Sequence, residues 1–213
     1  MTMRRIAVVT AGLSNPSSTR LLADRLAEAV RAQLAEREIE VGVDVIELRE
    51  HAHAITDNLL TGFARPELAE AIETVTSADA LIAVTPIFTT SYSGLFKSFL
   101  DNLDPDSLRG KPVLLAATGG SPRHSLALEY AMRPLFTYLH ANPVSTSVFA
   151  AAEDWAGGEG ASSLRSRTER AAGELADAVA RRDPTIAEDP FDPATYLGEG
   201  RSFESLLGGL SAD

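Results

Sequence analysis

Short apolar runs alternate along the chain with longer segments in which apolar residues recur at every third or fourth position. The short runs have the length of buried strands, whereas the longer spacing is typical of one face of a helix. The predicted strands are residues 6–10, 41–46, 80–85, 112–118 and 144–149. The predicted helices are residues 22–36, 66–75, 95–103, 125–139 and 162–181. Residues 51–65 are interpreted as a polar connection.

This regular alternation of strand and helix predicts an α/β fold, with a doubly wound, five-stranded parallel sheet that carries helices on both faces. In such a sheet, ligands bind beyond the carboxyl ends of the strands, at a topological switch point. Three connections that follow strands are expected to meet there. They are residues 12–19, 86–93 and 118–124.

Composition narrows the function classes. The chain has 213 residues, of which 45% are hydrophobic and 23% charged, as is ordinary for one globular domain. It contains no cysteine, which excludes disulfides, thiolate catalysis and thiolate metal sites. The formal net charge of −11 argues against nucleic acid and against an anionic membrane surface as partners.

Acidic residues are concentrated at the carboxyl end, where residues 183–213 hold seven acids against one arginine. We therefore predict a folded domain at residues 1–182 and an acidic C-terminal tail at residues 183–213. No apolar run reaches the roughly 18 residues of a membrane span. The first strand follows Met1 almost directly, without the cleavage region of a signal peptide, so we expect a cytoplasmic protein.

The first connection opens directly into a helix and is rich in hydroxyl groups. Hydroxyls and free backbone amides at a helix N-terminus form an anion site that needs little net positive charge, and a phosphate monoester fits it. The candidate ligands are Ser14, Ser17, Ser18 and Thr19. Alternatively, Ser17 or Ser18 is simply the helix N-cap. The segment matches neither the nucleoside-triphosphate loop G-x-x-x-x-G-K-[ST] nor the dinucleotide pattern G-x-G-x-x-G.

The other two connections suit a flat ring with polar edges. Residues 86–93 combine small, hydroxylated and aromatic side chains, and Gly119 and Gly120 allow close approach of a planar ligand, although Gly-Gly is also common in plain turns. Replacing Gly119 with leucine is then expected to abolish ligand binding and leave the fold intact. A phosphate-binding loop beside two ring-binding loops predicts FMN in a flavodoxin-like sheet of order 2-1-3-4-5.

The middle third of the chain resembles a known family. Residues 86–101 fit the pattern P-x-[YF]-x-x-S-x-S-G-x-x-K-x-x-x-D, which together with a Gly-Gly loop is typical of the NADPH-dependent FMN reductases. The resemblance covers about residues 5–180 and is closest to the reductases of sulfonate-type two-component monooxygenases. The shared positions are Thr85-Pro86, Tyr92-Ser93-Gly94, Leu100-Asp101, Ala117-Thr118-Gly119-Gly120, Tyr130-Ala131 and Pro134. In the first connection the chain departs from its relatives, because Asn15 stands where they often carry arginine.

The resemblance implies a role for each loop. The phosphate of FMN is expected at Ser14, Ser17, Ser18 and Thr19. The isoalloxazine is expected against Pro86, Ile87, Phe88, Thr89 and Ser91. The pyrimidine edge is expected at Thr118, Gly119, Gly120 and Ser121.

The function that the resemblance implies is an NAD(P)H-dependent FMN reductase, which supplies reduced FMN to a partner flavin-dependent monooxygenase. The hydride donor is NADPH or NADH, and no catalytic side chain is named because the cofactor carries the chemistry. The resemblance also implies a homodimer or homotetramer, with Phe96, Phe99 and Tyr130 as candidates for its interface. The alternatives are a quinone or azo reductase with tightly bound FMN, a flavodoxin-like electron carrier without its own NAD(P)H activity, and a flavin-less assembly protein.

Other polar residues give weaker signals. Arg123 and His124 border the third connection and are candidates for contact with the flavin or the nicotinamide nucleotide. Alternative candidates for the 2′-phosphate of NADPH are Arg20 and Arg109. His51 and His53 lack a third ligand, so no metal site is predicted. Lys97 and Asp101 lie four residues apart on a predicted helix and are expected to form a structural ion pair.

Overall fold

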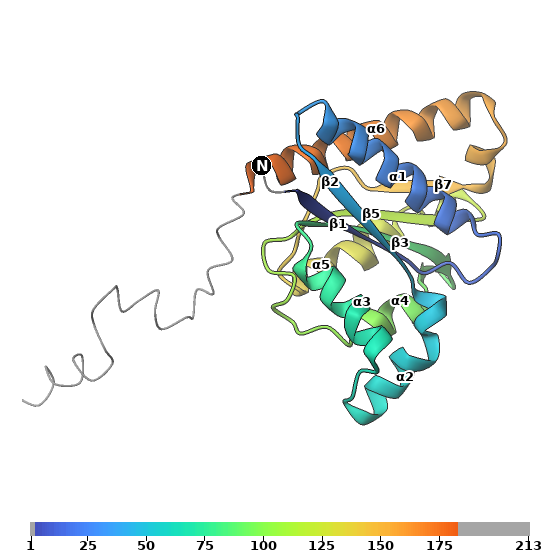
Figure 1. Ribbon diagram of the computed structural model, residues 1–213. Coiled ribbons are helices and arrows are strands. Elements are labelled where there is room, and N and C mark those ends of the chain that lie inside the picture. Colours follow the sequence, from blue (N-terminus) through green and yellow to red (C-terminus); the bar gives the residue numbers. More distant parts are fainter. Residues whose placement is uncertain (1–2, 183–213) are drawn as a thin grey trace, which may run out of the picture. The chain divides into compact units, whose positions relative to one another are not determined.

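The computed structural model describes residues 3–182, and the predicted acidic tail lies outside the described residues. A parallel sheet runs through the middle of this part of the chain (Figure 1). Its strand order is β2-β1-β3-β5-β6, which confirms the predicted flavodoxin-like order of five parallel strands. Four of these five strands are β1 (Arg4–Thr10), β2 (Val41–Glu47), β3 (Ala80–Phe88) and β5 (Pro112–Gly119).

The fifth parallel position is divided between two short strands, so the predicted strand at residues 144–149 is only partly right. The first is β6 (Asn142–Pro143), which pairs with the start of β5, and the second is β7 (Val148–Ala151), which pairs with its end. Between them, the Thr146 amide and hydroxyl donate to the Glu174 carboxylate at 2.7 and 2.6 Å. This side chain thus replaces the neighbouring strand as the hydrogen-bond partner.

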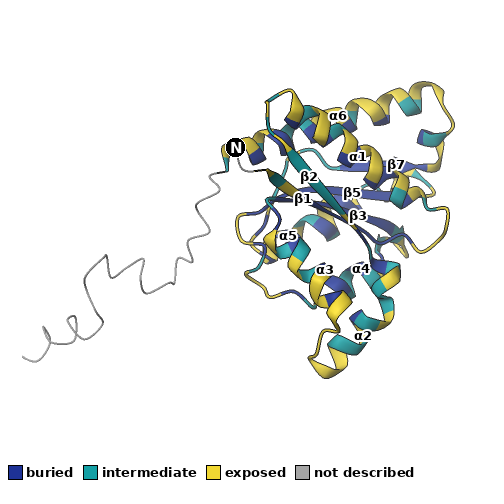
Figure 2. Cartoon of the chain, in the orientation of Figure 1, coloured by how far each residue is buried: buried dark blue, intermediate teal, exposed yellow. Residues whose placement is uncertain are grey.

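Helices cover both faces of the sheet (Figure 1). The two long helices, α1 (Ser18–Ala35) and α6 (Gly158–Arg181), pack on one face, against Ile6 and Val8. On the other face, Ala7 and Val9 face a second apolar core. The helices on that side are α2 (Ala52–Thr61), α3 (Pro66–Ser77), α4 (Gly94–Leu100) and α5 (Arg133–Tyr138). Figure 2 shows β3 and β5 buried between these two layers, whereas β2 is largely of intermediate exposure.

Helix α2 lies within residues 51–65, for which the sequence predicts a polar connection, so this prediction is wrong. Ile55 is its one fully buried residue, and a single anchor gives no apolar stripe in the sequence. The helix ends at Gly62, whose left-handed conformation (φ 73°) favours glycine.

The predicted helix at residues 125–139 begins irregularly. Residues Leu128–Met132 form a π-helical turn before α5 starts at Arg133. Pro134 has no amide hydrogen and cannot donate to the carbonyl four residues earlier, which explains why the α-helical pattern does not run through this segment. The last helix begins at Gly158, four residues before the predicted start at Ser162.

Two of the three predicted interface residues lie in the core of the subunit itself. Phe96 and Phe99 are fully buried on the α4 side of the sheet, and the rings of Phe96 and Phe136 lie 6.2 Å apart. The expectation that Phe96 and Phe99 contribute to an oligomer interface is therefore wrong. Tyr130, by contrast, is 79% exposed. The predicted pair of Lys97 and Asp101 is present, with 2.5 Å between Nζ and Oδ1.

Candidate functional site

One pocket of about 560 Å³ opens where β1, β3 and β5 end, the edge at which the three connections were expected to meet. The loop between β1 and α1 lies at this edge of the sheet in Figure 1. The lining residues are Leu13, Ser14, Ser17, Ser18, Thr19, Pro86, Ile87, Phe88, Thr118, Gly119, Gly120, Ala152 and Trp155. The structure thus brings all the predicted site residues together except Thr89, Ser91 and Ser121.

The first connection folds back tightly before α1. Ser17 is the N-cap, since its Oγ accepts a hydrogen bond from the Arg20 amide at 3.2 Å. A Cβ at Gly12 would lie 2.1 Å from that Oγ, so the loop requires glycine there. The capping alternative is confirmed for Ser17. It leaves the amides of Ser18 and Thr19 at the pocket without carbonyl partners within the helix, and the positive end of the helix dipole favours an anion beside them.

A buried hydrogen bond joins the first and third connections. The hydroxyls of Thr19 and Thr118 lie 2.8 Å apart, and both side chains are almost completely buried. Their residues are far apart in sequence but lie on neighbouring elements at the same edge of the sheet. This bond fixes the start of α1 against the end of β5, between the predicted phosphate and ring positions.

The second connection is a hairpin and not an irregular loop. Pro86 still pairs with Thr118 of β5, whereas Ile87 and Phe88 continue β3 and pair with Tyr92 and Ser91 of β4 (Ser91–Tyr92). Thr89 forms the turn in a left-handed conformation (φ 49°). The hairpin therefore presents Pro86, Ile87 and Phe88 to the pocket, while Thr89 and Ser91 are not among the lining residues.

The base of the hairpin is held by Thr85, which is fully buried. Its Oγ1 accepts a hydrogen bond from the Ser93 amide at 3.0 Å, and Ser93 in turn caps α4 by accepting from the Phe96 amide at 3.2 Å. The end of β3 and the start of α4 are thereby connected through two side chains. This arrangement keeps the apolar wall of the pocket in a fixed position.

The two glycines of the third connection differ in their surroundings. A Cβ at Gly119 would lie 2.8 Å from the Phe149 ring, whereas one at Gly120 would meet no atom within 4 Å. Substitution of Gly119 would therefore displace the buried Phe149 ring, so leucine at this position is expected to cost stability as well as ligand affinity. Ser121 caps the short turn at Pro122–His124 and is not among the lining residues.

Sequence reasoning missed three lining residues, Leu13, Ala152 and Trp155. Ala152 and Trp155 belong to a 3-10 turn, η4 (Ala152–Trp155), directly after β7. The sequence pattern ends the last predicted strand at residue 149 and assigns no site residue to the connection after it. The available signal was that Trp155 is the only tryptophan in the chain.

The pocket is electrically neutral in a strongly acidic protein. Among the residues that the structure describes, its lining includes no Asp, Glu, Lys or Arg side chain. Arg20 lies on α1 close to the first connection, but it forms ion pairs with Asp24 at 2.8 Å and with Glu47. The hydrogen bond to Asp24, followed by the charges of Asp24 and Glu47, raises the pKa of Arg20 against the opposing effect of burial. Arg20 is therefore occupied by carboxylates.

The remaining candidates lie outside this pocket. Arg123 and His124 line a separate cavity of about 300 Å³ together with Tyr130. Arg109 pairs with Asp106. Within residues 3–182, no group of three or more His, Asp or Glu side chains could hold a metal ion.

The residues present fit FMN. A volume of about 560 Å³ lies within the usual range for small-molecule sites. One end offers hydroxyls and helix amides for a phosphate, and the other offers an apolar hairpin beside an open glycine for a flat ring. A neutral lining avoids repulsion between the phosphate and the acidic groups that are abundant elsewhere in the chain.

Residues 4–156 match the family described as NADPH-dependent FMN reductase. The chain belongs to this family. This FMN reductase is 39% identical over 155 residues to the NADH-dependent FMN reductase SfnE of Pseudomonas putida. The match covers 71% of the chain and 78% of that relative. The family assignment confirms the predicted NAD(P)H:FMN oxidoreductase.

Solved structures agree with this assignment. An oxidoreductase from Corynebacterium diphtheriae is 45% identical, with a TM-score of 0.83 over 86% of the chain and 100% of that protein. The apo form of an NADH:FMN oxidoreductase, EMOB, is 31% identical, with a TM-score of 0.68 over 80% of the chain and 89% of that protein.

Proposed function

We propose that this FMN reductase acts in the cytoplasm, binds FMN at the pocket described above, takes a hydride from NADH or NADPH, and releases reduced FMN to a flavin-dependent monooxygenase. The observation that carries the proposal is the convergence of the predicted residues on one neutral pocket at the N-terminus of α1, in a chain with a net charge of −11. Such a site suits a ligand that joins a phosphate to an apolar ring.

The phosphate end is formed by Ser14, Ser17, Ser18 and Thr19. The amides of Ser18 and Thr19 donate from the first turn of α1, and the serine hydroxyls lie beside them in the lining. Ser17 Oγ accepts from the Arg20 amide, which leaves its hydroxyl hydrogen free to donate to an anion.

The ring end lies between Pro86, Ile87 and Phe88 on one side and Thr118, Gly119 and Gly120 on the other. When bound, FMN supplies the hydride-accepting ring, so this chain needs no side-chain acid or base for the transfer itself. The residues contribute orientation, because hydride transfer requires two rings held in contact in a defined geometry. The open space beside Gly120 allows the backbone to approach the polar edge of the ring.

Release of the product is supported by the form of the pocket. Phe88 lies in its lining at the ring end and is 47% exposed, so this end opens to solvent and is not sealed by the subunit. An open site suits a flavin that arrives and leaves in each catalytic cycle. The monooxygenase as its destination rests on the resemblance to the reductases of sulfonate-type two-component systems.

We also propose that the enzyme is a homodimer or homotetramer. Leu126, Tyr130 and Tyr138 are large, apolar or aromatic, and 62%, 79% and 70% exposed, and all lie on the segment that leads into and forms α5. Exposed aromatic side chains grouped on one element are typical of a protein interface. Light scattering on the purified enzyme tests the assembly, and a monomer at micromolar concentration would contradict it.

Turnover with free flavin tests the central part of the proposal. The purified enzyme is mixed anaerobically with NADH or NADPH and a large excess of FMN, and bleaching of the flavin absorbance is followed. We expect many FMN molecules to be reduced per subunit, and we expect most of the flavin to separate from the protein on gel filtration. Oxidation limited to one retained flavin per subunit would contradict release and favour the quinone or azo reductase. No oxidation would favour the electron carrier.

A further inference from the structure

Trp155 contributes to the pocket from an element outside the three predicted connections. It lies at the end of η4, and its ring is partly buried against the core between α1, α6 and the sheet. The guanidinium carbon of Arg25 lies 4.7 Å from the centroid of this ring. At this distance a cation and an indole attract each other, so Arg25 holds the wall that Trp155 forms.

The contact with Arg25 places Trp155 at one particular end of the pocket. Arg25 follows Ser18 by seven residues on α1, which is close to two helical turns, so both lie on the same face about 10 Å apart along the axis. Trp155 lines the pocket together with Ser18 and also reaches Arg25. It therefore stands beside the first two turns of α1, at the phosphate end.

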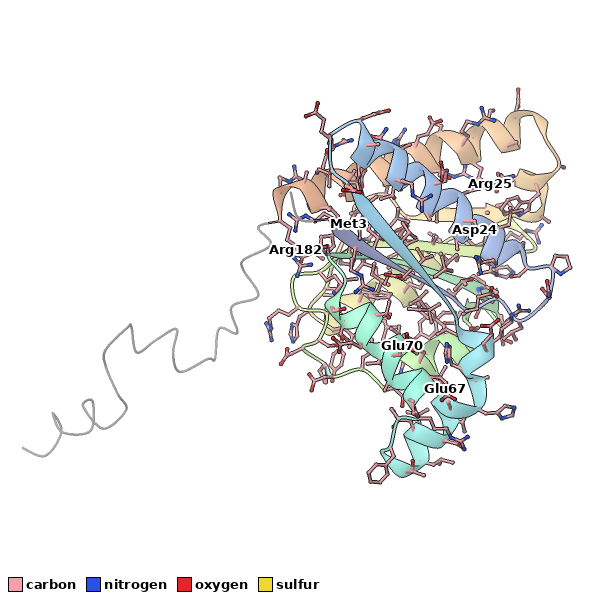
Figure 3. All side chains as sticks on the ribbon, viewed as in Figure 1. Met3, Asp24, Arg25, Glu67, Glu70 and Arg182 are labelled. Carbon is pink, nitrogen blue, oxygen red and sulfur yellow. The ribbon has the colours of Figure 1, made fainter. Side chains whose placement is uncertain are left out.

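Arg25 differs from the other arginines of α1 in its partner. Arg20 is paired with Asp24 and Glu47, and Arg31 is paired with Glu28 at 3.3 Å. Within the described residues, the contact of Arg25 that the structure shows is the Trp155 ring, and no carboxylate within 4.0 Å neutralises it. Figure 3 labels Arg25 beside Asp24 on α1. Its positive charge therefore favours an anion at the adjacent end of the neutral pocket.

We propose that Trp155, held in place by Arg25, closes the phosphate end of the flavin pocket and selects FMN against FAD. The inference rests on the proposed FMN site. FMN ends at its phosphate monoester, whereas FAD continues through a pyrophosphate into adenosine. An indole fixed beside the phosphate end leaves room for the first ligand and obstructs the continuation of the second. Trp155 is then a specificity-determining residue and Arg25 a positioning residue.

Paired binding measurements test this selection. Dissociation constants for FMN and FAD are measured by calorimetry for the wild type, W155A and W155F. We expect the wild type to prefer FMN at least tenfold, or about 1.4 kcal/mol, and W155A to lose most of that preference because the wall is gone. W155F keeps an aromatic wall and is expected to retain most of the preference. Because Trp155 also contacts the core, W155F remains informative if W155A does not fold.

Substitutions on α1 separate the positioning of Trp155 by Arg25 from the mere removal of a positive charge. We expect R25Q to weaken FMN binding several-fold and to reduce the preference for FMN over FAD. R25K keeps the charge and is expected to retain part of the affinity for FMN and part of the preference. The matched control is R31Q, which removes a charge from the same helix without touching Trp155 and is expected to change neither constant. Trp155 is the only tryptophan, so its fluorescence reports directly on the wall. Its emission is expected to shift in R25Q and to remain unchanged in R31Q.

The outcomes distinguish this inference from the proposed function. If the wild type reduces FMN but binds FAD as tightly, or if W155A is folded and keeps the full preference, only the role of Trp155 is overturned. If R25Q and R31Q behave alike, the positioning role of Arg25 is overturned. If the wild type binds neither flavin, the proposed function fails and the inference fails with it.

Discussion

The two edges of the parallel sheet, at the amino and carboxyl ends of its strands, differ in the charge and pairing of their polar groups. At the amino edge, Lys111 is only 2% exposed, and its ammonium donates to the carbonyl of Thr76 at 2.9 Å and to that of Ala78. Nearby, Arg4 pairs with Asp79 at 3.0 Å. At the carboxyl edge the pocket is lined by hydroxyls, glycines and apolar side chains, without a charged group among the described lining residues.

The difference shows which end of the sheet is built for stability and which for binding. Charged groups at the amino edge are satisfied by partners inside the protein, so their removal should cost folding free energy. At the carboxyl edge the donors of the first turn of α1 are left for a ligand, so changes there should cost affinity. Substitutions at the two edges are therefore expected to separate stability from binding.

The largest effect on binding is expected from filling the open glycine of the pocket. A leucine at Gly120 meets no existing atom near its Cβ but occupies space at the ring end. We expect G120L to weaken FMN binding by at least a hundredfold, or about 2.7 kcal/mol, with an unchanged melting temperature. Calorimetry and thermal unfolding measure the two quantities.

The neighbouring glycine provides the control. Even alanine at Gly119 would bring its Cβ within 2.8 Å of the Phe149 ring, so G119A is expected to lower the melting temperature. If G120L bound FMN like the wild type, the assignment of the third connection to the flavin ring would be wrong.

At the amino edge, K111M is expected to lower the stability and to leave FMN affinity unchanged. It leaves the carbonyls of Thr76 and Ala78 without the ammonium donor, and a buried group without a partner costs about 1–3 kcal/mol. Chemical denaturation measures this loss, and FMN affinity should remain that of the wild type. A parallel loss of affinity would show that the two edges are not independent.

A smaller, mixed effect is expected from T118V, which removes the hydrogen bond between Thr19 and Thr118 but keeps the shape of the side chain. Both hydroxyls are buried, so the loss of stability should be about 1 kcal/mol. Because this bond also fixes the start of α1 at the phosphate end, FMN binding should weaken a few-fold. A loss of stability without any change in FMN affinity would show that the bond has a structural role only.

The smallest effect is expected at Glu129, which is not among the residues that line the flavin pocket. Its hydrogen bond from Arg133, together with one from Ser147, lowers the pKa of Glu129 below its ordinary value of 4.5, against the effect of burial. A lowered pKa in the folded state means stability that is present above that ordinary value and lost as the pH falls through the folded one. Because the pair is partly exposed, we expect E129Q to cost about 0.5 kcal/mol near neutral pH. The difference from the wild type should vanish in acid, as denaturation at several pH values would show.

The alternation of apolar runs predicted the parallel sheet because buried parallel strands leave a strong local signal, whereas the strand order was predicted from the three ligand-binding connections. It also placed the pocket, since the ends of parallel strands meet at one edge. Thr89 and Ser91 are not among the lining residues because they belong to a hairpin, set by left-handed turn residues, which looks like a loop in the sequence. Trp155 was missed because the predicted last strand ended at residue 149, whereas β7 runs to Ala151 and the turn η4 follows it directly.

A crystal structure of the enzyme with FMN tests the account most directly. We predict the phosphate within hydrogen-bond distance of the Ser18 and Thr19 amides, and the ring between the hairpin at Pro86 and the backbone of Gly120. FMN bound elsewhere, for example in the cavity lined by Glu129, Phe149 and Arg167, would contradict the assignment of the carboxyl edge as the flavin site.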